Sequence, residues 1–126
     1  MGAATVLTYM GQEIGEHQGK VKCAIYDSGF SDLRLVVDSF TASNPIAGAM
    51  AAFLLPMVNM QVKKKTGLDI ETYKPKVHAE KISIPGLFLQ GSEDGLIVPQ
   101  HTAENYEAYG DERKNKIVFS GDHNDE

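Results

Sequence analysis

The feature that most constrains the fold is a set of three short apolar segments, separated by longer segments with helical patterns. The apolar segments are Val21–Tyr26, Gly86–Gln90 and Ile117–Phe119. The first is continuous except for Lys22, as expected for a strand that is buried on both faces of a parallel sheet. Parallel strands need crossover connections, which helices usually supply. The order of the segments therefore predicts an α/β fold with three parallel strands and flanking helices.

Helical patterns fill the segments around these strands. A first helix, which we end near Glu16, is indicated by apolar residues spaced i, i+3, i+4, i+7 and i+11, namely Ala3, Val6, Leu7, Met10 and Ile14. Ser31 or Asp32 is placed to cap a second helix, and Pro99 is placed to begin a later one. These helices are the predicted flanks of the sheet.

The longest apolar stretch, Pro45–Met60, is interpreted as a buried or half-buried pair of helices. Pro56 has no backbone donor and therefore predicts a kink or a break between the two. A membrane span requires about 20 apolar residues, whereas this stretch is shorter and is interrupted. We therefore predict no transmembrane segment.

Composition and charge argue against several classes of partner. The 126 residues carry a net charge of −5, whereas nucleic-acid binding requires a concentrated basic face. The basic run Lys63–Lys65 is short and suits the C-terminal end of a helix. The single cysteine, Cys23, fits a reducing compartment and is expected to be a small core residue. Because no signal peptide is visible either, we expect a cytoplasmic protein that does not bind nucleic acid.

Two candidate catalytic side chains follow the last two strands. Asp94 comes four residues after the second strand, and His123 comes four residues after the third. The carboxyl ends of parallel strands lie at one edge of the sheet, with neighbouring strands about 4.8 Å apart, so these loops can meet. A carboxylate that accepts from one imidazole nitrogen leaves the other nitrogen to act as a base. We therefore predict that Asp94 and His123 form an acid–base pair.

The segments around these residues resemble the α/β-hydrolase superfamily, and most of all its serine aminopeptidase-like branch, whose members have a short lid or none. The resemblance is carried by Met1–Thr5, Asp27–Leu33, Ile84–Asp94, Val98–Pro99 and Gly121–Asn124. It covers essentially the whole chain but only the C-terminal half of the fold. The resemblance implies one partial α/β-hydrolase domain over residues 1–126, in which residues 27–85 include a candidate cap or lid insertion.

The resemblance also implies a role for each matching residue. Asp94 would be the acid of a catalytic triad, His123 the general base, and the backbone N–H of Met1 an oxyanion-hole donor. Met1–Ala4 is similar to the part of a Gly-x-Ser-x-Gly turn that follows the serine, so the nucleophile is expected directly before Met1. No serine within the chain has the flanks of that turn, including those near the predicted strand ends, Ser28, Ser31, Ser92 and Ser120.

The function implied by the resemblance is that of a serine hydrolase in the full-length protein. Such an enzyme cleaves an ester, amide or peptide bond of a small-molecule or peptide substrate through an acyl-enzyme. The 126-residue chain is expected to be inactive alone, because it lacks the nucleophile. Two alternatives stay open: a noncatalytic binding protein with the same fold, and an inactive truncated fragment.

A metal site in the acidic tail is a further alternative. Carboxylate-rich clusters bind divalent ions, and the tail contains Asp122, His123, Asp125 and Glu126. Neighbouring residues at a chain end rarely converge on one ion, however. We therefore expect no metal and no cofactor.

Overall fold

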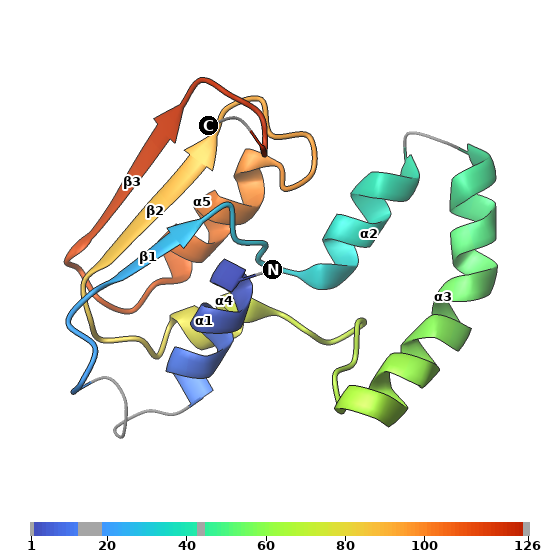
Figure 1. Ribbon diagram of the computed structural model, residues 1–126, viewed down its shortest axis with the longest axis horizontal. Coiled ribbons are helices and arrows are strands. Elements are labelled where there is room, and N and C mark those ends of the chain that lie inside the picture. The colour runs from blue at the N-terminus through green and yellow to red at the C-terminus, as the bar shows by residue number, and fades with distance from the viewer. Residues whose placement is uncertain (1, 13–18, 43–44, 125–126) are drawn as a thin grey trace. The chain divides into compact units, whose positions relative to one another are not determined.

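The computed structural model describes residues 2–12, 19–42 and 45–124 (Figure 1). Within these ranges the elements are, in chain order, α1 (Gly2–Gln12), β1 (Ala24–Asp27), α2 (Leu33–Ala42), α3 (Pro45–Thr66), α4 (Pro75–Ala79), β2 (Gly86–Gly91), α5 (Pro99–Ala108) and β3 (Lys114–Phe119). The chain forms two compact units. Residues 32–73 make up one, with α2 and α3, and the remainder of the chain makes up the other.

The sheet belongs to the larger unit, and its three strands are parallel in the order β1-β2-β3. The central strand pairs on both sides, so that Gly86 lies opposite Ala24 of β1 and opposite Lys114 of β3. This arrangement confirms the predicted α/β fold with three parallel strands and flanking helices. The third strand begins three residues earlier than predicted, at Lys114.

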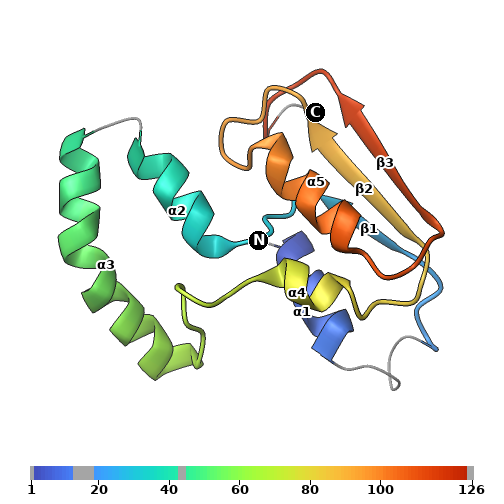
Figure 2. The ribbon, with the colours of Figure 1, turned by 180° about the vertical axis from the view of Figure 1, so that it is seen from behind.

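Side chains from α1, α4 and the end of α5 pack against one face of the sheet, which carries Tyr26 and Phe88. The buried core residues are Leu7, Met10, Tyr26, Ala79, Ile82, Ile84, Phe88 and Tyr109. Figure 2 shows this side, with α5 lying in front of the strands. The rings of Tyr26 and Phe88 lie 4.9 Å apart, and both contact Tyr109. The core is therefore built on a single face.

The prediction that the first strand is buried on both faces is wrong. Tyr26 is buried, whereas Ile25, which points to the opposite face, is 62% exposed. Cys23 precedes the strand and is exposed, so its predicted place in the core is also wrong. The reason is that the core side chains gather on the Tyr26 face, so that alternate residues of β1 differ in burial.

The short helix α4 has no counterpart among the predicted helices, since five residues are too few to show a period. It packs against α1 at Gly11. A Cβ atom added to Gly11 would lie 2.2 Å from the carbonyl oxygen of His78 in α4. The two helices therefore approach each other more closely there than any other residue would allow. The predicted end of the first helix, near Glu16, lies outside the described residues.

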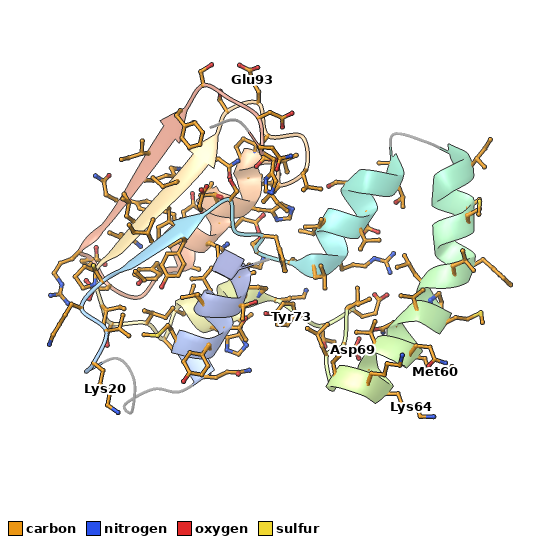
Figure 3. The ribbon with its side chains drawn as sticks, viewed as in Figure 1. Lys20, Met60, Lys64, Asp69, Tyr73 and Glu93 are labelled. Carbon is orange, nitrogen blue, oxygen red and sulfur yellow. The ribbon has the colours of Figure 1, made fainter. Side chains whose placement is uncertain are left out.

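In the smaller unit, local signals in the sequence explain where the helices begin and end. Asp32 caps α2 as predicted, because its Oδ1 accepts the backbone N–H of Arg34 at 2.9 Å. After α3 the chain turns at Gly67, whose φ is 75°. Asp69, labelled in Figure 3, pairs with Lys63 of the last turn at 2.8 Å. The lysine run thus belongs to a helix end, as expected.

Of the kink or break predicted at Pro56, the break does not occur. The helix α3 continues from Pro45 to Thr66 with Pro56 inside it. Proline removes one backbone donor, and the hydrogen-bonded turns on both sides can keep the helix continuous across that position. The stretch was predicted to be a buried or half-buried pair of helices, whereas it forms one helix on which Met50, Phe53 and Met57 are more than half exposed. In the described part of the chain, no helix is long and apolar enough to cross a membrane.

A partly buried polar cluster joins α5 to two other segments of the larger unit. The Ser31 hydroxyl donates to Glu104 at 2.8 Å and lies 2.8 Å from Nδ1 of His101. Lys76 pairs with the same Glu104 oxygen at 3.0 Å. Burial raises the pKa of Glu104, but the hydrogen bonds from Ser31, Gln100 and Lys76 outweigh it and lower the pKa to about 2. Glu104 is therefore ionised and holds both segments.

We expect Gly11→Ala to lower the free energy of unfolding by about 1–3 kcal/mol, because the added methyl group meets a backbone carbonyl that cannot easily move. Gly2→Ala in the same helix is the matched control, since nothing lies within 4 Å of its Cβ position. It should be neutral or stabilising by up to about 1 kcal/mol, the helix propensity gained. Urea unfolding measures both changes. Equal stability of Gly11→Ala and the parent protein would contradict the close contact.

The Glu104 cluster predicts a specific loss of stability in acid. The pKa of Glu104 in the folded state, about 2, lies below the ordinary 4.5. Its contribution to the free energy of unfolding is therefore complete above pH 4.5 and is lost as the pH falls toward 2. Glu104→Gln should lower the free energy of unfolding at pH 7 by about 2 kcal/mol and flatten its fall between those pH values. Glu107→Gln, an exposed change on the same helix, is the control. Identical pH profiles of the two variants in urea unfolding would count against the cluster.

Candidate active site

Asp94 lies in the loop after β2, and its side chain has no exposed surface. Its Oδ1 atom accepts the backbone N–H groups of Leu96 and Ile97, at 3.0 and 2.8 Å. An aspartate that accepts from the backbone two and three residues ahead forms a tight turn. Oδ1 therefore shapes the loop, and Oδ2 is left for partners from elsewhere.

The loop after β3 brings His123 to Asp94. The distance from His123 Nδ1 to Asp94 Oδ2 is 2.7 Å. The two loops are joined by backbone hydrogen bonds as well, from Ser92 N–H to Phe119 O at 2.8 Å and from Glu93 N–H to Gly121 O at 3.0 Å. The structure thus brings together the two side chains that the sequence placed at neighbouring strand ends.

Glycine at position 91 makes this approach of the loops feasible. A Cβ atom on Gly91 would lie 2.5 Å from the carbonyl oxygen of Gly121. Any side chain there would push the loop after β3 away from the loop after β2. The contact between Asp94 and His123 therefore requires a residue without a side chain at position 91.

Electrostatics assigns the proton between the two side chains. Burial raises the pKa of Asp94, but hydrogen bonds from His123, Ile97 and Leu96 outweigh it and leave the pKa below its ordinary value. At neutral pH the carboxylate is therefore ionised and can only accept, so Nδ1 of His123 carries the proton. Asp94 holds Nδ1 and leaves Nε2 for another partner, and the His123 side chain is 25% exposed. Such a ring can act as a general base.

The remaining predicted site residues are not joined to this pair. Met1, the expected oxyanion-hole donor, lies outside the described residues. In the described part of the chain, no serine hydroxyl is hydrogen-bonded to the His123 ring. The other serines near strand ends are occupied elsewhere or exposed: Ser28 donates to Asp27, Ser31 to Glu104 and Ser120 to Glu93, and Ser92 is exposed.

The cluster of Ser31, His101 and Glu104 contains the residue types of a hydrolytic triad, yet its geometry is that of an internal anchor. Ser31 has no exposed surface and His101 is 3% exposed. A nucleophile must reach its substrate, and this hydroxyl is enclosed by α5 and its own loop. The sequence offered no signal for His101 or Glu104, because buried polar residues on a helix do not alter its apolar period.

The metal alternative finds no support in the residues that the structure places. Asp125 and Glu126 of the proposed tail cluster lie outside them. Among the described residues, no three of the types His, Cys, Asp and Glu converge so that they could hold a metal ion.

Solved structures with a similar fold are hydrolases. An acetyl xylan esterase from Paenibacillus sp. R4 superposes with a TM-score of 0.66 at 15% identity, over 98% of this chain and 38% of that protein. The Pyrococcus furiosus esterase Pf2001 gives 0.58 at 19%, over 98% and 42%. The Pyrococcus horikoshii acylaminoacyl peptidase gives 0.58 at 15%, over 98% and 18%. At these identities the similarity shows an α/β-hydrolase fold. The chain spans less than half the length of each of these three proteins.

The sequence itself matches a family. No curated protein matches the chain. The family described as serine hydrolase (FSH1), however, matches residues 2–124, which include all three strands and both members of the Asp94–His123 pair. The chain therefore belongs to the FSH1 serine hydrolase family, within the α/β-hydrolases.

Proposed function

We propose that Asp94 and His123 are the acid and base of a catalytic triad, in a serine hydrolase that cleaves an ester, amide or peptide bond of a small-molecule or peptide substrate. The observation that carries this proposal is the 2.7 Å hydrogen bond between His123 Nδ1 and the buried carboxylate of Asp94. The pair lies at the carboxyl ends of two neighbouring strands, where open α/β sheets gather functional residues.

The proposed reaction uses the two nitrogens of His123 separately. Nδ1–H donates to ionised Asp94, which orients the ring so that Nε2 is the base. Nε2 takes the proton of a serine hydroxyl as that oxygen attacks the substrate carbonyl, and it then gives the proton to the leaving group. Water hydrolyses the acyl-enzyme by the same route. Asp94 stays ionised throughout and stabilises the imidazolium.

We place the nucleophilic serine directly before Met1, with the Met1 N–H as an oxyanion-hole donor. In support, a Cβ on Gly29 would lie 3.0 Å from Cβ of Ala3, near the first described residue of α1. Gly29 follows β1, so the first turn of α1 lies at the sheet edge where the loops of Asp94 and His123 meet. A helix N-terminus at that edge favours the negative charge of an oxyanion.

We further propose that residues 1–126 are part of one α/β-hydrolase domain, and that residues 27–85 include its cap. Residues 32–73 support this view, because they form a compact unit of their own between β1 and β2. The cytoplasmic location stays a prediction from the sequence.

A fluorophosphonate probe, which reacts with activated serines, tests the proposal. A longer protein that carries the serine before Met1 is expected to be labelled at that residue. The 126-residue chain is expected to remain unlabelled, since none of the serines that the structure describes is hydrogen-bonded to the His123 ring. A longer protein that carries the serine and is not labelled would favour the noncatalytic alternative. Labelling of the 126-residue chain would contradict the placement of the nucleophile.

The acid can be tested by Asp94→Asn in the longer protein. The amide does not hold His123 with its proton on Nδ1, so kcat for an ester substrate should fall by about 10⁴-fold while KM changes little. Glu93→Gln is the matched control. Glu93 is an exposed carboxylate in the same loop that is bonded to Ser120, and its change should cost at most a few-fold (Figure 3). Comparable losses in the two variants would rule out a special role for Asp94.

A further inference from the structure

The buried carboxylate of Asp94 has a fourth partner that the proposed triad does not include. Its two oxygens offer about four acceptor positions. Leu96, Ile97 and His123 occupy three of them, and the fourth is met by the side-chain amide of Gln90, whose Nε2 lies 3.3 Å from Oδ2. Gln90 is the second-to-last residue of β2 and is 1% exposed. Asp94 therefore has its full set of donors only when Gln90 is in place.

The partners of Gln90 define the orientation of its amide group. The two hydrogens of Nε2 are shared among three acceptors, because the carbonyl oxygens of Gly91 and Ile97 lie 2.9 and 3.1 Å away, closer than Asp94 Oδ2 at 3.3 Å. All three acceptors around Nε2 lack a proton, so the amide cannot be reversed. On the other side, Oε1 accepts the hydroxyl proton of Thr102 in α5. The side chain thus joins the start of the Asp94 loop to its end, and α5 holds it there.

We propose that Gln90 is a positioning residue for the acid–base pair, and that Thr102 locks it in its conformation. Gln90 holds the Asp94 loop closed and keeps Oδ2 turned toward Nδ1 of His123. Its action passes through Asp94, since no contact joins Gln90 to the His123 ring in the described part of the chain. This role rests on the proposed function, in which the pair is catalytic.

The chemistry of the position favours a neutral donor. A carboxylate in place of the amide would put a second negative charge against Asp94 Oδ2 and would repel it. An apolar side chain would leave Asp94 Oδ2 with His123 as its one remaining side-chain donor and would remove a donor from the carbonyls of Gly91 and Ile97, which is costly for buried acceptors. Glutamine supplies the donor without changing the charge that His123 meets.

The test is Gln90→Met in the longer protein, because methionine has nearly the same length and cannot hydrogen-bond. The ¹⁵N shifts of the His123 ring report its tautomer. The parent protein should show the proton on Nδ1, shifted far downfield by Asp94, and Gln90→Met should show mixed tautomers with faster exchange of that proton. The misplacement of the His123 ring should lower kcat by about 10²-fold, with KM changed much less.

Gln100→Met is the matched control. It makes the same chemical change in the first turn of α5, where the Gln100 amide is exposed and bonds only Glu104 among the described contacts. The His123 signals should stay as in the parent protein. If Gln90→Met leaves the tautomer and the exchange rate unchanged as well, the proposal is overturned.

Thr102→Val provides a second variant in case Gln90→Met does not fold. This change keeps the amide of Gln90 and removes only the hydroxyl that donates to Oε1. The exchange rate of the His123 Nδ1 proton should therefore lie between the rates in the parent protein and in Gln90→Met. An exchange rate equal to that of the parent protein would overturn the locking role. The ring signals are read without any substrate. If the parent protein hydrolyses no substrate, the proposed function is refuted. The ring signals would still show whether Gln90 positions Asp94 and His123.

Discussion

The arrangement of the loops after β2 and β3 depends on one buried carboxylate, that of Asp94, which must receive hydrogen bonds. An ionised group without exposed surface is tolerated only when donors replace the water that it has lost. For Asp94 those donors come from its own loop, from the end of β2 and from the loop after β3. The same contacts that stabilise the charge also close the loop and aim one oxygen at His123. The hydrogen bonds that satisfy the buried charge are therefore the same ones that set the geometry of the proposed acid–base pair.

The helix α5 connects this carboxylate to the rest of the larger unit through its polar side chains. Thr102 holds Gln90, and through it the Asp94 loop. On the same helix, Glu104 holds Ser31, and the amide of Asn105 donates to the carbonyl of Gly29 at 2.8 Å. Both Ser31 and Gly29 belong to the loop after β1. The helix therefore fixes the loops after two strands, and it does so with buried hydrogen bonds that are strong in a low dielectric and costly to leave unmade.

The contacts of Ser31, His101 and Glu104 illustrate why residue types alone do not identify a site. The same three kinds of side chain serve as a nucleophile, base and acid when the hydroxyl can reach a substrate. Here the hydroxyl of Ser31 and the ring of His101 are enclosed, and Glu104 also neutralises Lys76. The difference between this anchor and the Asp94–His123 pair is access, because the His123 ring remains partly exposed.

Much of the fold, and the Asp94–His123 pair of the candidate site, were predictable from local patterns. Apolar runs located the three strands, and the positions of Asp94 and His123 after two of them predicted their contact, because parallel strands end at the same edge. Burial and partner choice were not predictable in this way. Ile25 is exposed because the core gathers on one face of the sheet, and α3 passes Pro56 unbroken. Gln90 reads in the sequence only as the last residue of a strand. Its role depends on Thr102 and Asp94, which the packing of α5 and the loop closure bring to it, and no local period records such contacts.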